Sequence, residues 1–266
     1  MSGFTFLWPD GKRLALTTSW DDGQIHDRRL VELFNRHGVK GTFNLNSALL
    51  GQGGKLAPSE LKTLFAGHEV AGHGVTHPYL ERLPESAMVN ELVVDRIELE
   101  KLAGYPVTGF ALPFGTYDSR VVRALAGCGY AYSRTVKATD AFGLPDNFLE
   151  WHPTCHHSKC LERLKDFVAP SPPWASRAKL FYLWGHSFEF DRNNNWGLIE
   201  EFCQEMAMIE DVWHATNIEV CRYVAAMRAL VFSVDGKLVH NPSRLAVWHE
   251  SEGGPAAIPP GDSRLP

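Results

Sequence analysis

The stretch RLALTTSWDDGQIHDRRLVELFNRHGVKGTFNL, residues 13–45, decides the fold. It begins with an apolar, β-like run, passes through the polar turn DDGQ, and then carries apolar residues at helical spacing from Leu30 to Phe34. Gly38 is placed to end that helix, and the run GTFNL follows as a second strand. This order of strand, helix and strand is typical of a parallel βα unit.

The same alternation continues along the chain. Further strands are expected at EVAGH, VTGFAL, YAYSR, KLFYLWGH and VWHAT. Further helices are expected to open at Pro58 and Ser59 and to run from Pro84 to about Leu102, Ser119 to Cys128, Trp196 to Glu210 and Ile218 to Leu230. Parallel strands joined by helices form either an open sheet or a barrel, and the pattern alone favours neither strongly.

The pattern changes near the C-terminus. We assign residues 1–230 to the α/β domain. Residues 231–249 alternate in polarity around Asp235 and Gly236, which predicts an appended β-hairpin. Residues 250–266 are rich in Gly, Pro and charge and are expected to be a flexible tail.

Composition excludes several classes of protein. The 266 residues carry a net charge of −5 with no run of Lys or Arg, so no nucleic-acid partner is expected. No window approaches the roughly 20 apolar residues that span a bilayer, so no membrane partner is expected. The N-terminus has no signal-peptide pattern, and five cysteines at irregular spacing favour reduced thiols; we therefore expect a cytoplasmic protein. Cys155 and Cys160 flank two histidines, but their spacing matches none of the usual zinc patterns.

Polar residues follow the predicted strands. Asp21 and Asp22 end the first one, and taken alone an Asp-Asp-Gly is more often a turn than an active site. Two adjacent carboxylates become useful when one binds a metal and the other stays free as a base. In a barrel the ends of parallel strands gather at one rim, where these carboxylates would meet the groups that follow other strands.

Two imidazoles follow the EVAG strand. His73 and His77 are four residues apart, and Pro78 disfavours a helical conformation for His77, so a turn or loop is expected. An Asp and two His from different strand ends are a usual ligand set for a catalytic divalent ion.

The motifs TSWDDG, GHEVAGHGVTHPYL, FALPFGTYD and LFYLWGHSFEF resemble, in order and rough spacing, those of the polysaccharide deacetylase family, carbohydrate esterase family four. The resemblance spans about residues 13 to 190 and suggests an intracellular, divergent member. It implies an α/β fold, here a distorted (β/α) barrel of seven or eight strands with the C-terminal β-hairpin extension. It also implies a bound divalent metal ion, with zinc expected.

The resemblance implies a role for each motif residue. Asp21 would be the general base and His186 the general acid, and the backbone N–H of Phe114 would meet the developing oxyanion. The metal ligands would be Asp22, His73 and His77.

The chain departs from the family at two motifs. Ala111 stands where the family has an arginine that orients the base, and Arg134, after the next strand, could substitute for it. Pro113 and Trp151 are assigned to the substrate groove, although Trp is more often buried in plain packing. His152, His156 and His157 are given no role beyond lining a rim.

Three functions stay open at this point. The leading one is a metal-dependent hydrolase that removes an acetyl or other acyl group from the nitrogen of a sugar or small amide. The second is hydrolysis of a cyclic imide or ureide, and the third is a non-catalytic sugar-binding protein on the same barrel. The expected partner is a small molecule or oligosaccharide; the exact substrate and the oligomeric state cannot be read from the sequence.

Overall fold

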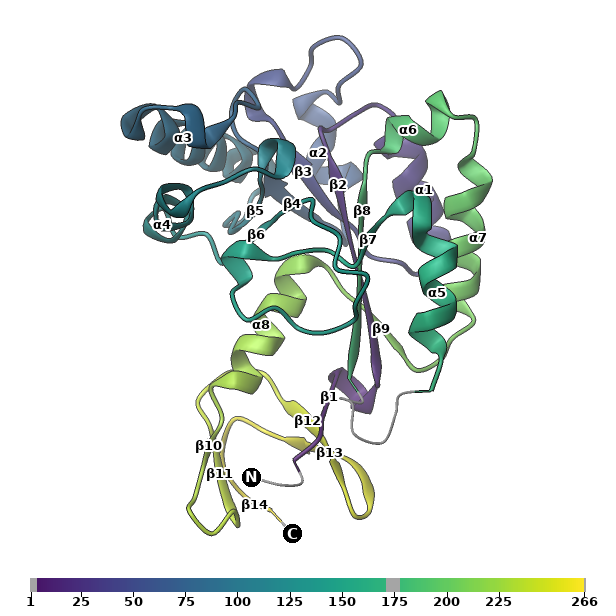
Figure 1. Ribbon diagram of the computed structural model, residues 1–266, viewed down its shortest axis with the longest axis vertical. Helices are drawn as coiled ribbons and strands as arrows, with labels where there is room; N and C mark the ends of the chain where they lie inside the picture. Colours follow the sequence, from purple (N-terminus) through teal and green to yellow (C-terminus); the bar gives the residue numbers. More distant parts are fainter. Residues whose placement is uncertain (1–3, 171–177, 266) are drawn as a thin grey trace.

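The computed structural model describes residues 4–170 and 178–265 and is built around one parallel β-sheet (Figure 1). Strands along the sheet follow the order β6-β5-β4-β3-β2-β8-β7, and β9 also pairs with β2. The strands are β2 (Leu14–Asp21), β3 (Thr42–Leu45), β4 (Glu69–Gly72), β5 (Gly109–Ala111), β6 (Tyr132–Arg134), β7 (Cys155–His156), β8 (Lys179–Gly185) and β9 (Val212–His214). Each pairing among them is parallel.

The sheet curls into an incomplete barrel. β2 pairs with β8 along its length, with β9 through its first residues and with β3 through its last. A bridge joins Trp151 to Arg134 at the end of β6, and a few residues later β7 pairs with β8. The short segment between Trp151 and β7 therefore links the two edges of the sheet. The predicted distorted (β/α) barrel is confirmed.

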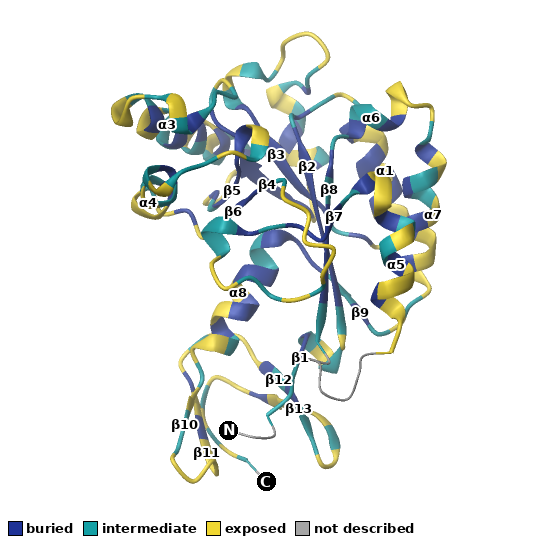
Figure 2. Cartoon of the chain, in the orientation of Figure 1, coloured by how far each residue is buried: buried dark blue, intermediate teal, exposed yellow. Residues whose placement is uncertain are grey.

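Helices cover the outside of the sheet and bury their apolar faces against it (Figure 2). They are α1 (Asp27–His37), α2 (Leu61–Leu64), α3 (Glu85–Ala103), α4 (Ser119–Gly127), α5 (Cys160–Val168), α6 (Ser187–Arg192), α7 (Trp196–Ala207) and α8 (Asn217–Arg228). In Figure 1, α1, α5 and α7 lie to the right of the strands and α3 and α4 to their left. Gly38 ends α1 in the left-handed conformation, as its position predicted. Helices α5 and α6 were not predicted from the sequence.

The C-terminal extension contains two small antiparallel sheets. One has the order β1-β12-β13 and the other β10-β11-β14. Their strands are β1 (Phe6–Leu7), β10 (Val231–Phe232), β11 (Leu238–Asn241), β12 (Val247–Ser251), β13 (Gly254–Ile258) and β14 (Gly261–Arg264).

This extension corrects the prediction of a flexible tail over residues 250–266. β13 pairs with β12 along five residues, and β14 pairs with β11 along four. Ile258 is 1% exposed, so the apparent tail contributes to a core. Its Gly and Pro content suggested disorder, but pairing with earlier strands satisfies the backbone and outweighs that local composition. The N-terminal strand β1 also belongs to this unit, because it pairs with β12.

Candidate active site

The candidate residues meet at the C-terminal rim of the barrel. β2 ends at Asp21, β5 at Ala111, β6 at Arg134 and β8 at Gly185, and the motif loops leave the sheet at these points. In a barrel of parallel strands the active site lies at this rim.

Asp22, His73 and His77 form a compact donor set. Nε2 of each histidine lies 3.9 Å from Oδ1 of Asp22, and the three ligand atoms are within 4.8 Å of one another. Nδ1 of His73 lies 2.7 Å from the carbonyl oxygen of Ala111, which as acceptor holds the proton on Nδ1 and leaves Nε2 free for an ion. Burial lowers the pKa of His73 to about 4, so the imidazole is neutral at pH 7. One carboxylate and two neutral imidazoles suit a divalent transition metal.

Asp21 is buried beside the donor set. Arg134 Nη2 donates to both carboxylate oxygens of Asp21, at 2.7 and 2.5 Å, and Asn44 Nδ2 donates to Oδ1 at 2.8 Å. Burial alone would raise the pKa of Asp21, but Arg134, His73 and His186 together with the Asn44 hydrogen bond lower it to about 2. The carboxylate is therefore ionised and held in one orientation.

Arg134 reaches Asp21 from the strand next to Ala111. Ala111 and Arg134 are register partners on β5 and β6, so their side chains leave the same face of the sheet. The Arg134 side chain is fully buried, and its guanidinium lies 4.6 Å from the centre of the Trp184 ring. The suggested substitution by Arg134 agrees with this geometry, one strand further along the sheet.

His186 directly follows β8 and lies near Asp21. Its Nε2 lies 3.9 Å from Oδ2 of Asp21, and its Nδ1 lies 3.6 Å from Oε1 of Glu189. The imidazole thus has one nitrogen towards the candidate base and the other towards a carboxylate on α6.

Pro113 and Phe114 follow β5 in a single 3₁₀ turn, Pro113–Gly115. The Phe114 ring stacks on Tyr79, with ring centres 3.8 Å apart and planes at 8°, and its centre lies 4.5 Å from that of His77. Pro113 is buried, whereas Phe114 is 45% exposed. An exposed aromatic ring next to a candidate metal ligand offers an apolar surface at the mouth of the site.

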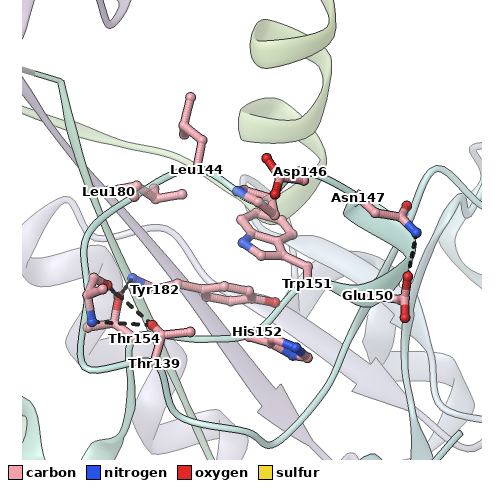
Figure 3. A pocket seen from close by; sticks show the side chains of 13 residues that line it. Thr139, Leu144, Asp146, Asn147, Glu150, Trp151, His152, Thr154, Leu180 and Tyr182 are labelled. Carbon is pink, nitrogen blue, oxygen red and sulfur yellow. Dashed lines mark hydrogen bonds between the residues drawn. The ribbon is translucent and has the colours of Figure 1, made fainter. Parts of the chain in front are cut away.

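Trp151 is only 1% exposed and packs among Tyr132, Phe148 and Tyr182. It lines a cavity of about 410 Å³ (Figure 3). His152 also lines the cavity, and its Nδ1 lies 2.6 Å from the hydroxyl of Thr135. Trp151 is thus mainly a packing residue that borders this cavity.

Asp95 is a buried residue of α3 that holds the histidine loop and that no sequence motif singled out. Its carboxylate accepts backbone N–H groups of His73 and Gly74 at 3.0 Å and of Ser47 at 2.9 Å. The sequence signal that could have identified Asp95 is a single acidic residue on the buried face of a helix. Lys55 was missed as well; its Nζ donates to the backbone oxygen of Asp22 at 2.8 Å.

Comparison with known proteins was made against this geometry. Residues 9–133 match the model of the family described as polysaccharide deacetylase. The match includes both aspartates, both histidines and the Pro113–Phe114 turn. Over these residues the chain resembles the polysaccharide deacetylase family.

Among curated deacetylases, the chain is 29% identical over 116 residues to the peptidoglycan-N-acetylglucosamine deacetylase of Bacillus cereus, covering 42% of this chain and 40% of that protein. It is 28% identical over 116 residues to the peptidoglycan-N-acetylglucosamine deacetylase PgdA of Listeria monocytogenes, covering 43% and 24%. The chain thus spans less than half of the length of either relative.

Solved structures show the same fold. A Mycobacterium smegmatis protein assigned to the polysaccharide deacetylases superposes with a TM-score of 0.64 at 20% identity, covering 86% of this chain and 96% of that one. Puue allantoinase superposes with a TM-score of 0.62 at 15% identity, covering 81% and 91%. At these identities the likeness establishes the fold alone. In the described part of the chain, no helix has both the length and the apolar character needed to cross a membrane.

Proposed function

We propose that this chain is a member of the polysaccharide deacetylase family and a metal-dependent N-deacylase that removes an acetyl or similar acyl group from an amino sugar or small amide. The arrangement of Asp21 carries the proposal. An ionised, buried carboxylate lies between a three-residue donor set and a histidine, and Arg134 fixes its orientation. Resemblance to the two curated deacetylases supports an N-acyl sugar as the substrate class.

Asp22, His73 and His77 would hold the ion, and zinc fits this donor set. Bound there, the ion would supply Lewis acidity, polarising the acyl oxygen and lowering the pKa of the attacking water. The attacking water needs a lowered pKa because the Asp21 carboxylate, whose own pKa is about 2, is a weak base.

The protein residues then divide the proton transfers. Asp21 accepts a proton from the water as its oxygen bonds to the acyl carbon. The backbone N–H of Phe114 donates to the oxyanion that develops there. His186 gives the proton on Nε2 to the substrate nitrogen as the carbon–nitrogen bond breaks, leaving a carboxylate and an amine. Phe114, Pro113 and Trp151 remain candidates for substrate contact, with Phe114 the most exposed of the three.

The other two functions have less support. The absence of an arginine at position 111 was the best argument for a non-catalytic sugar-binding protein, and Arg134 removes it. The fold likeness to an allantoinase is in favour of the ureide alternative, but at 15% identity it is evidence of the fold and not of the reaction. We also propose that the protein acts in the cytoplasm, where its five free cysteines would stay reduced.

The test is acetate release from a panel of N-acetylated and O-acetylated sugars and small amides. The protein is first stripped with a chelator and then reloaded with zinc or cobalt. Metal-dependent release from N-acetyl compounds is expected. No release from any member by fully loaded protein, at levels above an Asp21→Asn control, would contradict the proposal.

A further inference from the structure

A second group of metal-ligand side chains lies on the far side of His186. Nε2 of His156 is 3.1 Å from Oε2 of Glu189, and Nδ1 of His186 is 3.6 Å from Oε1 of the same carboxylate. One ligand atom from each of the three residues lies within 4.8 Å of the others. Nε2 of His157 is also 3.5 Å from Oε2 of Glu189. None of these residues belongs to the donor set of Asp22, His73 and His77.

The polar atoms around this cluster favour a bound metal ion over protons on the individual side chains. The Nδ1 atom of His186 is buried and makes no hydrogen bond. On the other side of the cluster, Nδ1 of His156 lies 3.0 Å from the hydroxyl of Ser158 and accepts the backbone N–H of Ser158 at 3.4 Å. An ion on Nε2 requires the tautomer with the proton on Nδ1, in which the Ser158 hydroxyl accepts that proton. Burial is the main cause that lowers the pKa of both His156 and His157.

The positive charge of Arg192 lies near the Glu189 carboxylate, but it does not prevent an ion from binding there. Arg192 Nη2 lies 3.4 Å from Oε1 of Glu189, but the Arg192 side chain is 60% exposed and can turn into solvent. The donor set of two or three imidazoles and one carboxylate is that of a divalent transition metal site and not of calcium or magnesium, which prefer oxygen.

We propose that His156, His186 and Glu189 form a second, inhibitory site for a divalent transition metal ion, with His157 beside it. An ion on Nδ1 of His186 takes the position of the proton that an imidazolium carries there. His186 then keeps its Nε2 proton as a hydrogen-bond donor but cannot release it to a leaving amine. Binding at this site does not depend on the proposed function; the inhibitory effect rests on the proposed role of His186 as the general acid.

Stoichiometry tests the site directly. Metal-free protein is titrated calorimetrically with zinc chloride, and bound zinc is measured by elemental analysis after dialysis. We expect two equivalents in the wild type, one in His156→Ala and one in Asp22→Asn. His152→Ala, a histidine of the same rim outside both groups, is the matched control and should keep two. Because His156 is partly exposed, its truncation should be tolerated, and Glu189→Gln repeats the test if it is not.

A wild type that never exceeds one equivalent would overturn the proposal, as would a second equivalent that persists in both His156→Ala and Glu189→Gln. Deacetylation by the wild type should fall at least about tenfold as the second equivalent loads, and His156→Ala should escape that inhibition. A second equivalent that is lost in His156→Ala yet never inhibits the wild type would uphold the site and contradict the acid role of His186. No binding at either site would instead contradict the proposed metal dependence.

Discussion

At the scale of the residue, three members of the candidate site share an unusual backbone. Asp22, His77 and Phe114 have φ angles of 82°, 61° and 59°, in the left-handed region that non-glycine residues rarely adopt. Each such residue costs on the order of 1–3 kcal/mol and persists only where the surrounding structure holds it. Here Lys55 binds the carbonyl of Asp22, and Pro78 follows His77. Strain gathered at two candidate metal ligands and a candidate oxyanion donor is typical of an active site.

Arg134 provides a prediction about the base. Arg134→Ala should retain the metal but lower kcat at least about tenfold, because Asp21 loses its orientation and its buried countercharge. Since positions 111 and 134 are register partners, adding Ala111→Arg to that variant should restore part of the lost turnover. Full activity in Arg134→Ala alone would contradict the assigned role. Steady-state kinetics with metal analysis of each variant makes the measurement.

His186 provides a second prediction, about the general acid. His186→Ala should reduce turnover of N-acetyl substrates far more than that of activated acetyl esters, whose leaving groups need little protonation. The loss on amides should be on the order of 10²-fold or more. The two substrates are compared on the same preparation of loaded enzyme. Equal losses on both would reassign His186 to binding or structure.

At the scale of the element, the strands and most helices were predictable because their patterns are long and local. The unit from β2 to β3 shows this: an apolar strand, an amphipathic α1 and a terminating Gly38 all agree. The helices α5 and α6 and the strands β13 and β14 were missed. The Gly and Pro content of β13 hid its pairing with the preceding strand β12, and β14 pairs with β11, which is not its neighbour in sequence. The pairing of Arg134 with Asp21, 113 residues apart, could only be guessed, since no local pattern encodes it.

The end of α1 gives a clean test of the left-handed backbone. Gly38 has φ 67°, and a Cβ there would meet nothing within 4 Å, so Gly38→Ala probes the conformation without a clash. It should lower the free energy of unfolding by about 1 kcal/mol. Gly127→Ala is the matched control: this last residue of α4 is equally open but has no positive φ, so its stability should be unchanged or higher. Equal effects of both substitutions in urea unfolding would contradict this account.

At the scale of the whole molecule, the barrel interior is polar as well as apolar. Glu69 is buried and accepts from Tyr132 Oη at 2.8 Å, Thr42 Oγ1 at 2.9 Å and Ile218 N–H at 2.9 Å. Burial raises its pKa to about 7 despite those hydrogen bonds. The sequence placed Glu69 in a strand but gave no sign of its polar surroundings, because they come from three distant segments.

The raised pKa of Glu69 predicts a pH-dependent stability. The folded state holds a proton there that the unfolded state releases above about pH 4.5, so stability is lost as pH rises from there to about 7. Glu69→Gln should therefore flatten part of the fall in unfolding free energy between pH 5 and pH 8. Glu32→Gln, an exposed carboxyl on α1, should leave the curve unchanged. Urea unfolding at stepped pH makes the comparison, and identical slopes in wild type and Glu69→Gln would contradict the prediction.

The central claim is that two adjacent aspartates have different tasks, and one pair of variants tests it. Metal content and turnover are measured on Asp21→Asn and Asp22→Asn, reconstituted with zinc alongside the wild type. Asp22→Asn should lose metal and activity together, because a charged ligand is gone. Asp21→Asn should keep its metal and lose at least about 10²-fold in kcat with little change in KM, because an amide cannot accept the proton of water. If Asp21→Asn holds its metal and keeps more than about a third of wild-type turnover, Asp21 is not the base.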